Sequence, residues 1–136
     1  MMTTENTKYI NTSAVAGKTY YYKVKAIAEN TDANSAYSAV KTRTCDLPRP
    51  EVTIALRSKD GKPRLKWDAV DGAVEYKIYR ATSKNGDFTV IKTTTSTSFT
   101  NTAAEAGTTY YYRVVAVASR NAANSAKSVV VSIQSK

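Results

Sequence analysis

The chain has 136 residues and a formal net charge of +9, with ten tyrosines, one cysteine and no histidine. The absence of histidine excludes His-based acid–base catalysis and removes the commonest transition-metal ligand. A single cysteine excludes an intrachain disulfide framework and a cysteine-rich zinc site. No apolar run approaches the roughly 18 residues of a membrane span, and the first residues lack the basic start and apolar core of a signal peptide.

The positive charge is spread along the whole chain. Residues 1–45 carry six basic and three acidic residues, and residues 46–136 carry 14 and 8. Basic side chains alternate with other residues, as in Lys23 with Lys25, which is the pattern of the solvent-facing side of a strand. No run of five like charges occurs, and such runs are what basic interaction tails show. We therefore expect no nucleic-acid partner.

The first 45 residues repeat a later part of the chain. Residues 7–43 align with residues 97–133 at an offset of 90, and 19 of the 37 pairs are identical without a gap. Self-similarity at a fixed period indicates tandem units. We therefore predict a complete domain at 46–136, preceded at 1–45 by the C-terminal half of another. The connection at 45–50 contains Pro48 and Pro50, which cannot continue a sheet ladder.

The complete unit is predicted to be built of short strands separated by turns. Asp60-Gly61, Asp71-Gly72 and Asn85-Gly86 mark turns, because these dipeptides tolerate positive φ. No stretch has the apolar spacing of an amphipathic helix. The predicted fold class is therefore an all-β sandwich. Its strands are expected at 51–56, 64–67, 75–81, 88–94, 98–100, 108–118 and 127–133.

Three of these strands carry a recognisable pattern. Leu65-x-Trp67, Tyr76-x-Ile78 and Gly107-Thr-Thr-Tyr110-x-Tyr112-x-Val114 resemble the signature of the fibronectin type III family. The resemblance implies an immunoglobulin-like sandwich of about seven strands. It also implies that the tryptophan is buried between the sheets and that Tyr110 forms a corner by bonding nearby backbone. One departure is Arg80, where the family often has an inward aromatic; we expect Arg80 to extend along the edge of the sandwich. The expected structural core is Leu65, Trp67, Tyr76, Ile78, Tyr110, Tyr112 and Val114.

The tandem, cysteine-poor units resemble modules of bacterial surface proteins and secreted polysaccharide-degrading enzymes. The resemblance implies an extracellular or cell-surface setting. In such proteins these modules hold adhesive or catalytic domains away from the cell wall. The predicted function is accordingly that of a non-catalytic spacer or interaction module, with no cofactor.

An alternative function is binding of carbohydrate or protein by an exposed sheet face. Alternation places Lys77, Tyr79, Tyr111 and Arg113 on the outward side of two strands. Tyrosine with arginine or lysine can stack on sugars or bind acidic partners. The same residues can also be cross-strand pairs that only stabilise the sheet, and the sequence leaves both interpretations open.

The acidic residues do not indicate an enzyme. Asp68, Asp71 and Glu75 lie in a strand–turn–strand region and need no chemistry to explain them. A glycosidase pair would require a sizeable cleft, which a sandwich of this size with a filled core lacks. Calcium binding would need more clustered carboxylates, so no metal site is predicted. Cys45 is expected to be an incidental thiol, since no histidine can activate it.

The half unit at the front lacks the strands that would cover it. Tyr20, Tyr22 and Val24 would present an apolar face without a partner, and some forty residues without a disulfide or metal rarely fold alone. The chain could be a fragment of a longer array whose missing strands lie upstream. Alternatively, two chains could associate through these strands, as in domain swapping or strand addition. For the isolated chain we predict a homodimer through Tyr20, Tyr22 and Val24.

Overall fold

The computed structural model describes residues 2–119 and 123–136, which form strands, loops and short 3₁₀ structure. The turn η1 spans Thr31–Ala33. The strands are β1 (Thr19–Tyr22), β2 (Lys41–Thr44), β3 (Val52–Leu56), β4 (Pro63–Trp67), β5 (Ala73–Ala81), β6 (Thr89–Thr94), β7 (Ser98–Thr100), β8 (Thr109–Ala118) and β9 (Val131–Gln134).

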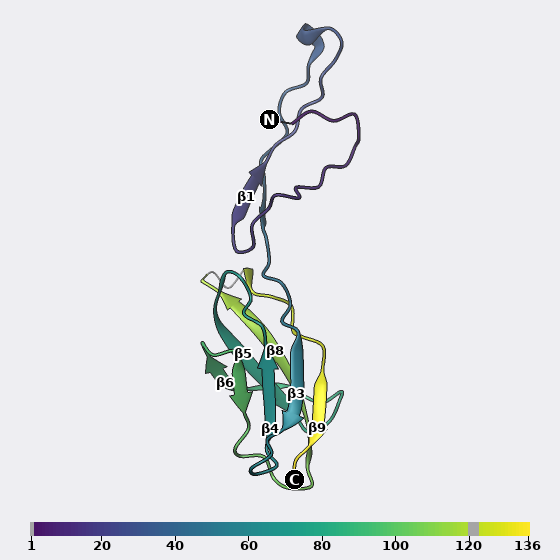
Figure 1. Cartoon of the computed structure of the whole chain (residues 1–136). Coiled ribbons are helices and arrows are strands. Elements are labelled where there is room, and N and C mark those ends of the chain that lie inside the picture. Colours follow the sequence, from purple (N-terminus) through teal and green to yellow (C-terminus); the bar gives the residue numbers. More distant parts are fainter. Residues whose placement is uncertain (1, 120–122) are drawn as a thin grey trace.

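Strands β3 to β9 form a two-layered sandwich (Figure 1). One sheet has the order β3-β4-β7 and the other has the order β6-β5-β8-β9. All neighbouring strands are antiparallel. The prediction of an all-β sandwich is confirmed. Six of the seven predicted strands agree with the observed bounds to within two residues.

The core lies between the two sheets. The inward side of β8, Tyr110, Tyr112 and Val114, packs with Leu65 and Trp67 from the opposite sheet. The Trp67 and Tyr76 rings meet edge to face, with centroids 5.4 Å apart, a geometry that adds to the free energy of burial. All seven residues expected to form the core lie in this cluster.

The tyrosine hydroxyls inside the sandwich are paired. Asn101 Nδ2 donates to the Tyr112 hydroxyl over 2.8 Å, and the backbone N–H of Glu105 donates to the Tyr110 hydroxyl over 3.1 Å. The second bond is the corner that the family resemblance implied. Burial raises the pKa of Tyr112, and the hydrogen bond from Asn101 partly offsets this shift. The loop at 101–105 is thereby tied to the core strand β8.

The last strand begins later than predicted. We expected it at 127–133, but β9 starts at Val131. Ahead of it, the Ser125 and Ser128 hydroxyls accept hydrogen bonds from the backbone N–H groups of Ala116 and Val114, each over 2.9 Å. Because side chains occupy the place of backbone carbonyls on these N–H groups, the segment follows β8 without forming a regular ladder.

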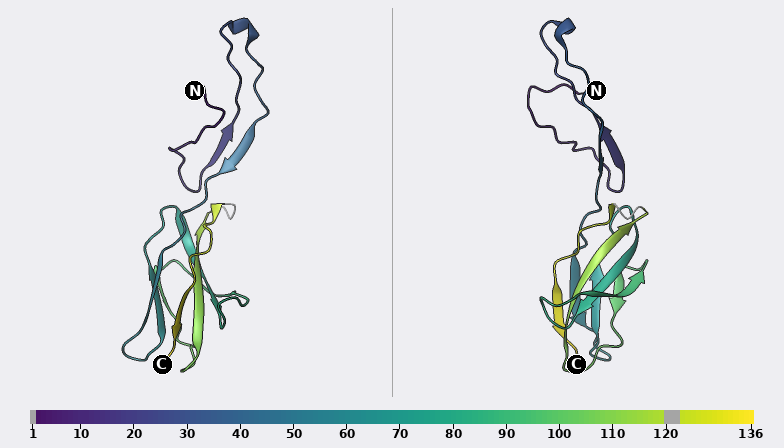
Figure 2. Two further views of the ribbon diagram at one scale, coloured as in Figure 1. Left: turned by 90° about the vertical axis from the view of Figure 1, so that its right-hand side faces the viewer. Right: turned by 180° about the vertical axis from the view of Figure 1, so that it is seen from behind.

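The N-terminal half forms a hairpin that projects from one end of the sandwich (Figure 2). Strands β1 and β2 pair with each other in a separate two-stranded sheet. The same side chain-to-backbone bonds recur at the offset of 90, with Ser35 and Ser38 accepting from Ala26 and Val24. Asn11 donates to the Tyr22 hydroxyl over 3.0 Å. The hairpin therefore has the local structure of the β8–β9 region.

The linker is anchored on the sandwich. Leu47 is buried, and its N–H donates to the carbonyl of Ala123 over 2.8 Å. A Cβ added to Gly72, whose φ is +83°, would lie 3.1 Å from the Leu47 side chain, so this turn needs glycine for both conformation and space. Ala16 of the hairpin packs against the same core. The predicted division between residues 45 and 46 falls just before this anchor.

We predict that Ser128→Ala destabilises the sandwich by about 1–3 kcal/mol, because the buried Val114 N–H loses its acceptor. Urea unfolding followed by fluorescence of Trp67, the one tryptophan of the chain, measures the change. Ser132→Ala removes an exposed hydroxyl from β9 and serves as the control, with an expected change within about 0.5 kcal/mol. Equal effects of the two substitutions would contradict the role of Ser128.

The raised pKa of Tyr112 predicts a loss of stability at alkaline pH. Above pH 10 the unfolded chain releases the Tyr112 proton while the folded chain retains it, so the free energy of unfolding falls by up to about 1.4 kcal/mol per pH unit from this group. Tyr112→Phe is less stable at neutral pH, but its stability should fall less steeply above pH 10. Urea unfolding between pH 8 and 11 tests this, and parallel profiles would refute it.

Candidate functional site

The outward side of the four-stranded sheet brings together the four residues predicted as a binding face. Tyr79 lies directly opposite Arg113 in the register of β5 and β8, while Lys77 faces Val115 and Tyr111 faces Ala81. Lys77, Tyr79, Tyr111 and Arg113 are all half-buried. Alternate positions on two neighbouring strands thus share one surface.

Two charged groups on this surface interact with aromatic rings of the chain itself. The Lys127 ammonium lies 4.9 Å from the centroid of the Tyr79 ring, and the Arg113 guanidinium lies 4.8 Å from that of Phe88. Such contacts stabilise exposed sites by about 0.5–1 kcal/mol. Neither Lys127 nor Phe88 was predicted from the sequence to contact this surface. Alternation alone could not reveal them, since both lie outside β5 and β8.

An open hollow of about 510 Å³ adjoins this surface. Arg113 Nε is buried there without a hydrogen-bond acceptor among the described residues. The lining is polar and mainly basic, which suits an acidic or hydroxyl-bearing group. Its lining residues are Lys84, Asn85, Gly86, Asp87, Phe88, Arg113 and Lys127.

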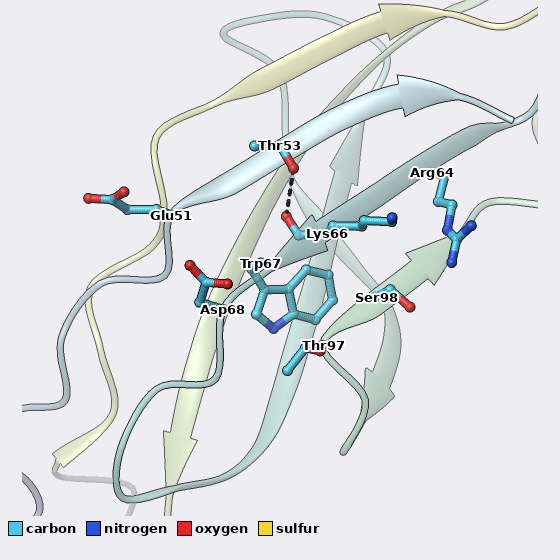
Figure 3. Close-up of a pocket in the computed structure, with 8 residues that line it drawn as sticks. All are labelled: Glu51, Thr53, Arg64, Lys66, Trp67, Asp68, Thr97 and Ser98. Atoms are coloured by element: carbon cyan, nitrogen blue, oxygen red, sulfur yellow. Dashed lines mark hydrogen bonds between the residues drawn. The ribbon is translucent and has the colours of Figure 1, made fainter.

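A second open hollow, of about 420 Å³, lies on the three-stranded sheet (Figure 3). Glu51 and Asp68 lie on one side of the Trp67 indole, and Arg64 lies on the other. The indole Nε1 has no acceptor among the described protein groups. Thr53 Oγ1 donates to the carbonyl of Lys66 over 3.3 Å and links β3 to β4 at this hollow. The mixed charges give this surface no preference for one sign of ligand.

The turn between β3 and β4 carries an ion pair. The Arg57 guanidinium forms a bidentate hydrogen-bonded pair with the Asp60 carboxylate. This hydrogen bond, more than any other cause, lowers the pKa of Asp60 to about 2. The Lys62 N–H also donates to Asp60, over 3.3 Å. These contacts fix a tight turn at the surface and do not assemble a reactive group.

Among residues 2–119 and 123–136, no group of three or more His, Cys, Asp or Glu residues could hold a metal ion. The same residues contain no helix long and apolar enough to cross a membrane. Cys45 is a free, half-buried thiol beside the linker.

The arrangement of the sheets defines an immunoglobulin-like β-sandwich, and comparison with solved structures identifies its type. The chain is similar to an Fn3-like protein from Clostridium thermocellum, with 34% identity and a TM-score of 0.57 over 65% of this chain and 92% of that one. A β-1,2-glucanase from Parabacteroides distasonis shares the fold alone, at 22% identity and a TM-score of 0.56 over 65% of this chain and 13% of that one. No family model matches. The chain belongs to the fibronectin type III family.

Two curated relatives extend the similarity. An amylopullulanase from Thermoanaerobacter thermohydrosulfuricus is 34% identical over 121 residues, which covers 83% of this chain. One from Thermoanaerobacterium saccharolyticum is 32% identical over 103 residues, or 74% of this chain. The chain spans only 8% of the length of each relative. It is thus homologous to a segment of these bacterial enzymes.

Proposed function

We propose that the chain is a non-catalytic spacer module from a tandem fibronectin type III array in a secreted bacterial enzyme that acts on polysaccharide. The observation that carries the proposal is the extent of similarity to an amylopullulanase. It covers 83% of the chain, which exceeds residues 46–136 and therefore reaches into the N-terminal half. If this chain and the relative both derive from tandem arrays of the same module, the relative should match both copies of the repeat.

The geometry of the sandwich supports a spacing role. Its interior is filled by the cluster around Trp67 and Tyr112, and the hollows on the two outer faces described above are open and shallow. Leu47 anchors the linker on the sandwich, so successive units are held apart by a connection that is itself ordered. Such a module separates the domains on either side of it without contacting their substrates.

We further propose that the chain functions outside the cell. The amylopullulanase relatives, by their name, act on polymers too large to enter a cell.

The spacer proposal predicts that the purified chain neither hydrolyses nor retains starch or pullulan. Release of reducing sugar and co-sedimentation with insoluble starch measure the two properties. A chain that releases sugar above the blank without enzyme would refute the non-catalytic role. Retention on starch would refute the pure spacer role and favour the alternative below.

The alternative function is carbohydrate or acidic-protein binding by Lys77, Tyr79, Tyr111 and Arg113. The observation that favours it is the unpartnered Arg113 Nε beside the Tyr79 ring on one sheet face. A ligand hydroxyl or carboxylate in the adjoining hollow could accept from the half-buried Arg113 guanidinium while a sugar ring stacks on the tyrosine.

A glycan array with the native chain and a Tyr79→Ala/Tyr111→Ala variant tests this alternative. If the face binds, the variant should lose affinity by at least about tenfold. The matched control is Tyr21→Ala, because Tyr21 is the repeat equivalent of Tyr111 and is 72% exposed on the hairpin. No binding by the native chain, or equal binding by the double variant, would reject this face as a site.

A further inference from the structure

One side of the N-terminal hairpin is uncovered, whereas the equivalent side of β8 is covered by the opposing sheet. In β8 the inward residues Tyr112, Val114 and Ala116 are completely buried. Their repeat equivalents on the hairpin are Tyr22, Val24 and Ala26. Val24 is 71% exposed, Ala26 is exposed and Tyr22 is half-buried. Equivalent side chains are thus buried in the sandwich and exposed or half-buried on the hairpin.

The identities between the two copies concentrate at positions that are buried in the sandwich. Between residues 97 and 133, twelve described residues are buried, and ten of them are identical in the hairpin. At the other 22 described positions, only nine are identical. The two buried exceptions, Lys25 for Val115 and Ile27 for Val117, lie on the opposite side of the strand, away from the other sheet. The hairpin therefore keeps every fully buried side chain that faces the opposing sheet, although Lys41 replaces the half-buried Val131 at the edge of the core.

The backbone edge of the hairpin is also open. Strand β8 uses one edge for β9 and the other for β5, with pairs from Ala73↔Ala118 to Ala81↔Tyr111. Strand β1 pairs with β2 in a sheet of two strands. Its second edge therefore offers backbone donors and acceptors to an added strand.

Space is present above the exposed residues. An open hollow of about 650 Å³ lies between residues 23–27 of the hairpin, Tyr37 and the segment at 2–7, so Lys23 and Lys25 line it together with Val24, Ala26 and Ile27. Tyr9, at the position of Phe99, is 52% exposed, whereas Phe99 lies in β7 opposite Leu65. The hairpin and the segment before it thus lack the strands that cover the equivalent residues in the sandwich.

We propose that this surface is a docking site for a half-sandwich with the chemistry of residues 46–96. The occupant supplies two strands like β3 and β4 across the apolar face and one strand like β5 along the open edge of β1. It inserts side chains equivalent to Leu65, Trp67 and Ile78 over Tyr20, Tyr22 and Val24. Residues 46–96 already cover the equivalent side chains in the sandwich, and this identifies the chemistry of the occupant.

Cys45 gives a direct readout of docking. It occupies the position of Ser135, which is 1% exposed and whose hydroxyl lies 3.5 Å from the Gly61 carbonyl. Cys45 is half-buried and is the one cysteine of the chain. Docking should bury it against the equivalent of Gly61 in the occupant.

The test is a fusion in which a second copy of residues 46–96 replaces residues 1–6 and is joined directly to Thr7. The Ser96–Thr7 junction then reproduces the natural Ser96–Thr97 connection. We expect the Cys45 thiol to react with a maleimide at least about tenfold more slowly than in the unmodified chain. The reference for a fully docked thiol is the double variant Cys45→Ser/Ser135→Cys of the unmodified chain, whose single cysteine lies inside the sandwich. The Cys45 thiol of the fusion should react at the rate measured for that variant. The control carries Trp67→Ala in the added copy only, and its Cys45 should react faster than in the intact fusion.

A second variant guards against failure of the fusion to fold. Replacing residues 97–133 by a copy of residues 7–43 in the full chain asks directly whether the hairpin sequence fits residues 46–96. A cooperative, Trp67-monitored unfolding transition is expected, and its absence would overturn the proposal. So would equal Cys45 reactivity in the fusion and the unmodified chain. A dimer of the unmodified chain in light scattering, with a protected Cys45, would assign the surface to a second copy instead.

Discussion

The packing of β8 against the sheet that carries Trp67 is the interaction on which the sandwich depends. A chain with one cysteine has no intrachain disulfide to join its sheets, so burial of large aromatic side chains must hold them together. Burying tyrosines brings their hydroxyls out of water, and each must then find a partner. Asn101 and the Glu105 N–H supply these partners, and these bonds tie the loop before β8 to the core strand.

The repeat separates local from tertiary contributions to this structure. The bond from asparagine to the second tyrosine is 2.8 Å in the sandwich and 3.0 Å in the hairpin. The tyrosine rings are 6.3 Å and 6.4 Å apart in the two places. Only the sandwich copy is covered by a second sheet. The local sequence from Asn11 to Ser38 therefore determines the geometry of the hairpin. Burial of its side chains, in contrast, depends on strands that lie outside this segment.

Alternation and turn dipeptides were sufficient to predict the fold class and to place Tyr79 and Arg113 on one face, because both follow from a period of two. They could not predict that β9 begins only at Val131. The run before it also looks like a strand, and whether Ser128 replaces a carbonyl depends on its register against Val114. The contacts of Lys127 and Phe88 with that face depend on loop conformation, which has no period to detect.

The two candidate surfaces differ in what a partner would have to displace. On the outer face of the sheet, a ligand competes with Lys127 for the Tyr79 ring and meets only an open hollow. On the hairpin, a partner gains an apolar face and an unpaired strand edge, and it would displace the segment at 2–7. Burial of Val24 and the aromatic side chains would release far more free energy than one cation–π contact. We therefore expect any association of this chain to use the hairpin, and the proposed occupant has the shape of residues 46–96 in the complete sandwich.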